Sequence, residues 1–395
     1  MHKFLSFMLL FLFINGTFVS IFSSVSTQEL IEDTWNTKAS MNQARRDLGV
    51  ITVEGKIYAI GGRTNNDRFV NTNERYDPVT DTWVTLTAMP TRRSNFAIAA
   101  YEDKIYCIGG ETSDENGKWS PCDITEVYDT TTDSWAIKKN LPTNEWKLQA
   151  STLDGKIFVA TYSHLYMYDP LQDSWTKKAS MFDMFHMGEL FISSSDNKLV
   201  AIHVTPHLDL QETHSEVKVM IYNTKSNKWS ERSKLPIESY PSQNYFTGAA
   251  GATGTTTERY TSQGIYLLTP INSAVYNLKN NTWTTATNML TPRTNFGVAV
   301  VDDVLYVIGG YAYTSSNNIG SMELLAINEQ YVPAGYYSTL TEETLPTEED
   351  DALFENLNMM SMVTAVLIGS IVTVGIILLY KKNDKNKSTN MIRKA

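Results

Sequence analysis

The sequence predicts an all-β repeat fold built from short strands and tight turns. A five-residue, largely apolar phrase recurs six times, and three copies end in a Gly-Gly doublet, at 56–62, 104–110 and 304–310. After each of the first five copies, a Tyr precedes a Trp by seven residues, with turn-forming residues between them. This pattern is typical of two short strands joined by a tight turn.

The repeats share a period. The Trp residues of the repeat, at 35, 83, 135, 175, 229 and 283, are spaced by 48, 52, 40, 54 and 54 positions. The residues that define the repeat are Trp35, Gly61, Gly62, Tyr76, Trp83, Gly109, Gly110, Tyr128, Trp135, Tyr168, Trp175, Tyr222, Trp229, Tyr276, Trp283, Gly309 and Gly310.

These marks resemble the kelch repeat, in which a Gly-Gly doublet precedes a Tyr-Asp pair and a Trp, and whose units run to about 50 residues. The doublet is missing from copies three, four and five. The resemblance implies a six-bladed β-propeller over residues 27–337, in which stacking of four-stranded sheets buries their faces.

The two ends of the repeat region predict how the ring closes. The sixth copy ends at 328–331 with no Trp after it, whereas Trp35 precedes the first copy with no Tyr seven residues before it. Residues 38–41 after Trp35 read Lys-Ala-Ser-Met, as do residues 178–181 after Trp175. We therefore expect the strand of Trp35 to complete the last blade.

The chain ends predict export and membrane attachment. Residues 1–26 resemble a cleaved secretory signal, with an uncleaved anchor as the alternative. Residues 359–380 are free of charge and long enough to form one transmembrane helix. An acidic stalk at 338–358 precedes this span and a basic tail at 381–395 follows it, so the propeller is expected outside the cell membrane in a single-pass type I arrangement.

Composition limits the partners and the chemistry. The chain has 33 basic and 43 acidic residues and a net charge of −10, which argues against nucleic-acid binding. Two Cys are too few for a disulfide scaffold. No cofactor and no metal site are expected.

The resemblance places a candidate binding site at the mouth of the central channel, where each inner strand begins. The residues at this junction are Arg45, Arg46, Arg93, Glu145, His186, Tyr240 and Arg293. Arg forks there suit a carboxylate ligand, but the same Arg side chains could instead brace neighbouring blades. The long connections 63–74, 111–125, 203–218 and 311–322 are expected on one face, which binds partners in this family.

Two further sites are open possibilities. Cys107 and Cys122 could form a disulfide in an oxidising compartment, or Cys107 could be a small buried apolar residue. Asn280 begins the one glycosylation sequon of the propeller region, Asn280-Asn281-Thr282.

The function predicted from these features is recognition of a protein or a glycan by a cell-surface module, without catalytic residues. The alternative is an extracytoplasmic sugar-processing enzyme of sialic-acid mutarotase type, with Arg93, Arg293 and Glu145 on one rim. An intracellular ubiquitin-ligase adaptor with kelch repeats is disfavoured, since such chains usually carry a BTB domain where this sequence has its predicted signal.

Overall fold

The structure is a computed structural model of the whole chain. It describes residues 31–66, 68–145, 147–161, 164–179, 189–195, 198–206, 215–234, 264–270, 273–314 and 321–334. These residues form strands, turns and connections, and none of the elements in these ranges is a helix that could cross a bilayer. The predicted signal, stalk, transmembrane span and basic tail lie outside the described residues.

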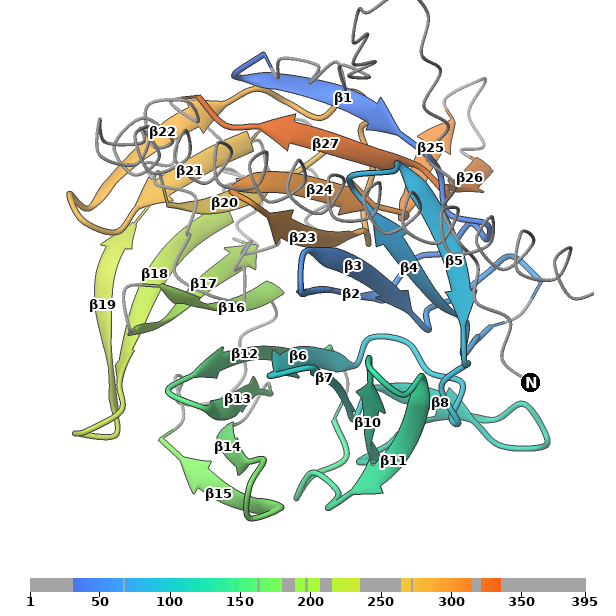
Figure 1. Cartoon of the computed structure of the whole chain (residues 1–395). Coiled ribbons are helices and arrows are strands. Elements are labelled where there is room, and N and C mark those ends of the chain that lie inside the picture. The colour runs from blue at the N-terminus through green and yellow to red at the C-terminus, as the bar shows by residue number, and fades with distance from the viewer. Residues whose placement is uncertain are drawn as a thin grey trace, which may run out of the picture.

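Six sheets surround a common centre and form a six-bladed β-propeller (Figure 1), which confirms the predicted architecture. Neighbouring strands within each sheet are antiparallel. The first strands of consecutive blades contact one another around the axis, as β2 contacts both β6 and β23.

Blades 1 to 3 each contain four described strands. Blade 1 consists of β2 (Gly49–Val53), β3 (Lys56–Ile60), β4 (Asn73–Asp77) and β5 (Thr82–Leu86). Blade 2 consists of β6 (Ala97–Tyr101), β7 (Lys104–Ile108), β10 (Thr125–Asp129) and β11 (Ser134–Lys138), with the hairpin β8 (Glu111–Ser113) and β9 (Trp119–Pro121) inserted. Blade 3 consists of β12 (Gln149–Leu153), β13 (Lys156–Ala160), β14 (Leu165–Asp169) and β15 (Ser174–Lys178).

Blades 4 to 6 follow the same plan. Blade 4 consists of β16 (Glu189–Ser195), β17 (Lys198–Pro206), β18 (Ser215–Asn223) and β19 (Lys228–Lys234). The described part of blade 5 consists of β20 (Ile265–Leu268), β21 (Ser273–Asn277) and β22 (Thr282–Ala286). Blade 6 consists of β23 (Gly297–Val301), β24 (Val304–Ile308), β27 (Asn328–Val332) and β1 (Thr34–Lys38), with the hairpin β25 (Tyr311–Thr314) and β26 (Ser321–Leu324) inserted.

The Tyr and Trp of each repeat have fixed roles. In blade 1, the Tyr76 hydroxyl donates to Asp81 Oδ1 at 2.6 Å, and Asp81 also accepts the amide of Ala39 from the preceding blade. The indole of Trp83 donates to the Ala39 carbonyl at 2.7 Å. The turn residue Asp81 has a positive φ of 52°, which Asp and Asn tolerate better than most residues. The indole bond to the blade before recurs for Trp135, Trp175, Trp229 and Trp35, so blades 1 to 4 and blade 6 are each tied to their predecessor in this way.

The N-terminal strand closes the ring, as predicted from Trp35. Strand β1 pairs with β27 and places Trp35 opposite Tyr331. The closure also supplies a residue that sequence reasoning missed, because Asp33 accepts the Tyr331 hydroxyl at 2.7 Å as Asp81 accepts that of Tyr76. Blade 6 is therefore assembled from both ends of the repeat region.

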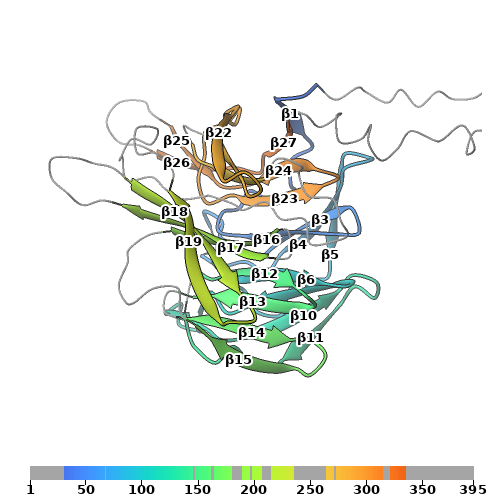
Figure 2. The same cartoon turned by 90° about the vertical axis from the view of Figure 1, so that its left-hand side faces the viewer.

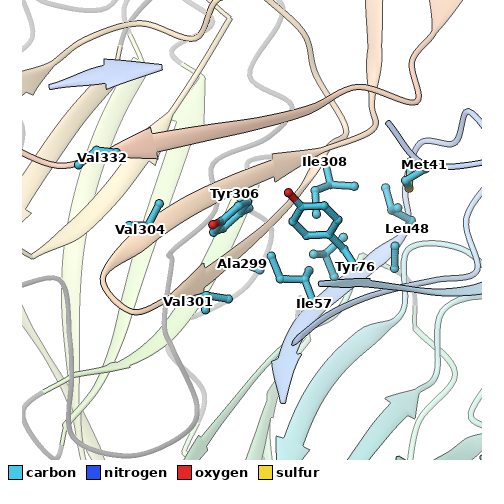
Figure 3. Close-up of a cluster of buried hydrophobic side chains, with 12 residues drawn as sticks. Met41, Leu48, Ile57, Tyr76, Ala299, Val301, Val304, Tyr306, Ile308 and Val332 are labelled. Carbon is cyan, nitrogen blue, oxygen red and sulfur yellow. The ribbon is translucent and has the colours of Figure 1, made fainter. Parts of the chain in front are cut away.

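The hydrophobic core is divided among the six seams of the ring. Each of six clusters of buried apolar side chains draws on two consecutive blades. Figure 3 shows the cluster at the seam between blades 6 and 1, where Ile57 and Tyr76 face Tyr306 and Ile308. The Tyr76 and Tyr306 rings are 5.9 Å apart. Among the described residues, each of the six seams is therefore packed by its own apolar cluster.

The Gly-Gly doublets are required where the second strand meets the next blade. Gly62 has a φ of 101°, and its amide donates to the Arg93 carbonyl at 2.8 Å. A Cβ on Gly61 would lie 2.7 Å from the same carbonyl oxygen. Only Gly combines this backbone conformation with such a close approach.

One expectation needs correction, and one alternative left open by the sequence is decided. The connection expected at 203–218 is strand at both ends, because β17 runs to Pro206 and β18 begins at Ser215. The possible disulfide is not formed, since Cys107 and Cys122 are both free, buried thiols. Burial raises the pKa of Cys107 to about 12, which keeps this thiol protonated.

The Asp33 contact predicts an acid-dependent difference in stability. The hydrogen bond from Tyr331 holds the pKa of Asp33 below its ordinary value. This carboxylate therefore stabilises the fold above about pH 4, the range of an unfolded Asp, and that contribution is lost as the pH falls through the folded pKa. We expect Asp33→Asn to be less stable than the wild type at pH 7 and the gap to narrow at about pH 3. Thermal unfolding at several pH values tests this, and a gap that does not change with pH contradicts it.

Candidate functional site at the channel mouth

In blades 1, 2 and 6, the connection between the second and third strands begins beside the segment that leads into the first strand of the same blade. Short antiparallel bridges join Arg46 to Arg63, Ser94 to Glu111, and Thr294 to Tyr311. These bridges place the connections of blades 1, 2 and 6 on one side of the propeller, which we call the loop face. Figure 2 shows the hairpin β25–β26 toward one side of the propeller and β1 toward the other.

Three predicted site residues lie inside the fold at this level. Arg45, Arg93 and Arg293 are at most 1% exposed. Their guanidinium groups form ion pairs with Glu74, Glu126 and Glu329 at 2.6, 2.6 and 2.7 Å. These Arg side chains are therefore structural, although each pairs within the blade that it enters and not with a neighbouring blade, which was the alternative left open by the sequence.

Backbone carbonyls complete the coordination of these guanidinium groups. Arg93 donates to the carbonyls of Gly109, Ile124 and Cys107 at 2.9, 2.8 and 3.3 Å. Arg45 donates to the carbonyls of Gly61, Thr72 and Ala59 in the same way. Burial lowers the pKa of Arg45, and its partner Glu74 opposes that effect. These Arg side chains hold the third strand of a blade to its entering segment.

The structure shows which of Arg45 and Arg46 in the first repeat corresponds to Arg93 and Arg293. Arg45 makes the contacts that Arg93 and Arg293 make, so Arg46 lies one position further along, where its side chain is partly exposed. Glu145 takes the equivalent position in blade 3, where it is half-buried and accepts the Thr143 hydroxyl at 3.1 Å.

Two predicted binding residues, His186 and Tyr240, lie outside the described part of the chain.

A polar network of Arg46, Asp47, Arg63, Ser94, Asn95, Glu111 and Asn295 joins blades 6, 1 and 2 at the mouth. We call it the mouth network. The amide of Asp47 donates to the Asn295 carbonyl at 3.0 Å, and the amide of Asn95 donates to the Asp47 carbonyl at 3.1 Å. The carboxylate of Asp47 accepts the Asn295 side-chain amide. Backbone and side-chain hydrogen bonds therefore connect the three blades to one another.

Two Arg of the mouth network are partly open to solvent. The side chains of Arg46 and Arg63 are 26% and 17% exposed. Arg46 pairs with Asp47 at 3.2 Å and lies over the Tyr311 ring, 5.3 Å from its centre. Arg63 pairs with Glu111 and donates to the Ser94 hydroxyl at 2.8 Å.

Positive charge is concentrated beside these two Arg. Arg63 and Arg68 both lie over the buried Phe69 ring, at 5.1 and 5.7 Å from its centre. Burial lowers the pKa of Arg63; nearby Asp47 opposes this, and the charges of Arg46 and Arg68 add to it. Acidic side chains thus partly neutralise Arg46 and Arg63. Arg68 beside them is exposed to solvent.

This geometry is suited to binding a ligand. Guanidinium forks at the mouth suit carboxylate groups of a ligand. Arg93 and Arg293, which the enzyme alternative assigns to a sugar carboxylate, are committed to Glu126 and Glu329. Within the described ranges no group of His, Cys, Asp and Glu is arranged to hold a metal ion.

Several residues of the site were missed from the sequence. The buried Glu partners had a signal, because Glu74, Glu126 and Glu329 each stand two residues before the Tyr of their repeat. Asp47 and Glu111 had none, since Asn295 on Asp47 and Arg63 on Glu111 come from neighbouring blades and meet these carboxylates only in the closed ring.

Comparisons with known proteins agree with the repeat architecture. A family model described as "Kelch motif" matches residues 44–90, 92–142 and 292–323. Kelch-like protein 41b of Danio rerio is 27% identical over 231 residues, which cover 56% of this chain and 32% of that protein. Kelch-like protein 36 of Rattus norvegicus is 26% identical over 215 residues, covering 51% of this chain and 32% of that protein. The chain thus spans about a third of the length of these relatives.

Proposed function

The chain belongs to the kelch-repeat family, and from this membership we propose that it acts as a protein-interaction module whose partner binds at the loop face. The observation that carries the proposal is the mouth network, which holds Arg46 and Arg63 partly exposed beside Tyr311. Arg and aromatic side chains in rigid, partly desolvated settings are typical of binding hot spots.

The rigidity of this surface supports a role in recognition. The two Arg face each other across an antiparallel bridge, an arrangement of like charges that is unfavourable by itself. Buried Asp47 and Glu111 offset that repulsion and fix both guanidinium groups. A ligand carboxylate would therefore meet preorganised donors and would lose less entropy on binding.

We also propose that the propeller is presented outside a cell membrane. The support is the sequence of residues 1–26 and 359–380, which has the length and charge pattern of a signal and a stop-transfer span. A protein partner is preferred to a glycan because the relatives that match are kelch-like proteins.

Removal of exposed charge from the loop face tests the interaction. We expect Arg46→Ala with Arg68→Ala to reduce capture of the partner from a cell-surface extract by about tenfold, the effect of losing one to two hot-spot contacts. The matched control is Lys177→Ala with Lys225→Ala, which removes two exposed charges elsewhere. Equal capture by both double variants would locate binding away from the mouth network.

A further inference from the structure

We infer that Asn280 is the acceptor of an N-linked glycan, on the side of the propeller away from the loop face. The inference rests on the proposed export of the propeller. Asn280 lies in the turn between β21 and β22 and is exposed. The Thr282 hydroxyl, which completes the sequon, donates to Asn280 Oδ1 at 2.6 Å.

The turn is built so that these two side chains touch. The same pair of positions carries Thr80 and Thr82 in blade 1, whose hydroxyl oxygens are 2.7 Å apart. In blade 2 it carries Thr132 and Ser134, at 2.8 Å. In blade 5 the same two positions carry Asn280 and Thr282, so the Thr hydroxyl contacts a carboxamide and not a second hydroxyl.

The neighbouring Asn has a separate, structural task. Asn281 Oδ1 accepts the Tyr276 hydroxyl at 2.7 Å, and the Asn281 amide donates to the Asn277 carbonyl at 2.9 Å. Asn281 is thus the counterpart of Asp81 in blade 1, while Asn280 lies at the tip of the turn. A glycan on Asn280 would leave the contact between Tyr276 and Asn281 in place.

The position of the turn keeps the loop face open. Asn281 in blade 5 corresponds to Asp33 in blade 6, since each accepts the hydroxyl of its repeat Tyr. Asp33 also donates its amide to the Val332 carbonyl at 2.8 Å, so both ends of the repeat region leave the propeller at the level of these turns. A bulky hydrophilic group there would stand on the side of attachment and away from Arg46.

The modification is an amide glycosylation with a lipid-pyrophosphate-linked oligosaccharide as donor. A bond forms between Asn280 Nδ2 and C1 of the first sugar, and the bond between C1 and the phosphate oxygen breaks. The amide proton leaves to a base of the transferase, and the lipid pyrophosphate is the leaving group. No oxidant or reductant takes part.

The test is expression of the full chain in cultured animal cells, followed by digestion of the membrane fraction with peptide N-glycosidase. We expect the wild type to lose the mass of one glycan. Asn280→Gln and Thr282→Ala should show no such loss, and Thr282→Ser, which keeps the sequon, should behave as the wild type. Lys118→Thr introduces a sequon that begins at Asn116 on the exposed β8–β9 connection, and this variant should carry a second glycan.

Each other outcome overturns the inference. A wild type without a glycan, beside a glycosylated Lys118→Thr variant, means that Asn280 is not an acceptor. No glycan on any variant means that the propeller does not enter the secretory lumen. A glycan that survives Asn280→Gln must lie at Asn15-Gly16-Thr17 or Asn386-Lys387-Ser388, and the second of these would place the tail outside. Partner capture by Asn280→Gln is measured in parallel, so failure here is separable from failure of the interaction module.

Discussion

Arg93→Ala should lower the free energy of unfolding by about 3–5 kcal/mol, the cost of leaving a buried charge without its partner. The guanidinium of Arg93 is fully buried, pairs with Glu126 at 2.6 Å and donates to three backbone carbonyls. Its removal leaves Glu126, which is 1% exposed, without the charge that balances its carboxylate. Denaturant unfolding followed by Trp fluorescence measures the loss.

The adjacent residue provides a matched control for this variant. Arg92 is exposed, so Arg92→Ala should change the free energy of unfolding by no more than about 0.5 kcal/mol. Replacing both partners, as Arg93→Met with Glu126→Met, should recover part of the loss because no unpaired charge remains. Equal effects of Arg93→Ala and Arg92→Ala would show that Arg93 is not the internal brace described above.

The difference in burial between Arg92 and Arg93 decides which Arg side chains a partner can contact. Arg45, Arg93 and Arg293 were predicted as binding residues at the channel mouth, yet all three form buried ion pairs inside the propeller. The more accessible cations are their neighbours, Arg46 and Arg92, together with Arg68 from the blade 1 connection. A change at the buried set would reduce binding by unfolding the propeller, whereas a change at the accessible set would reduce it directly.

Much of the fold follows from the repeat alone. The spacing of Tyr and Trp predicted paired short strands, and the missing Trp after 328–331 predicted closure by Trp35, which the register of β1 with β27 confirms. The Gly-Gly doublets, the buried Arg and a Glu two residues before the repeat Tyr occur together in blades 1, 2 and 6. That association was readable from the sequence and would have predicted the three ion pairs.

The mouth network could not be predicted in this way, for a physical reason. Asp47 and Asn295 are 248 positions apart and meet only because the last blade lies beside the first. Arg63 and Glu111 belong to connections that vary in length and composition between the repeats. Periodicity specifies what every blade shares, while a binding surface depends on what differs among them.

Trp35→Ala should destabilise the propeller by about 3–5 kcal/mol, the range for truncating a large buried aromatic side chain. Trp35 is 7% exposed, its ring lies 4.9 Å from that of Tyr331, and its indole donates to the Thr287 carbonyl at 2.9 Å. These contacts hold the strand β1, which no turn connects to the blade that it completes. Loss of the side chain therefore weakens the pairing of β1 with β27, which joins the two ends of the repeat region within blade 6.

Trp135→Ala is the matched control for the closure. Trp135 makes the same kind of indole hydrogen bond, to the Thr87 carbonyl at 2.9 Å, but it is more exposed and its strand follows β10 through a tight turn. We expect a smaller loss of stability than for Trp35→Ala and no increase in proteolysis at the N-terminal strand. Denaturant unfolding and limited proteolysis of both variants make the comparison. If the two substitutions have equal effects on both measurements, β1 contributes no more than any other outer strand, and the ring is held closed by its hydrophobic seams.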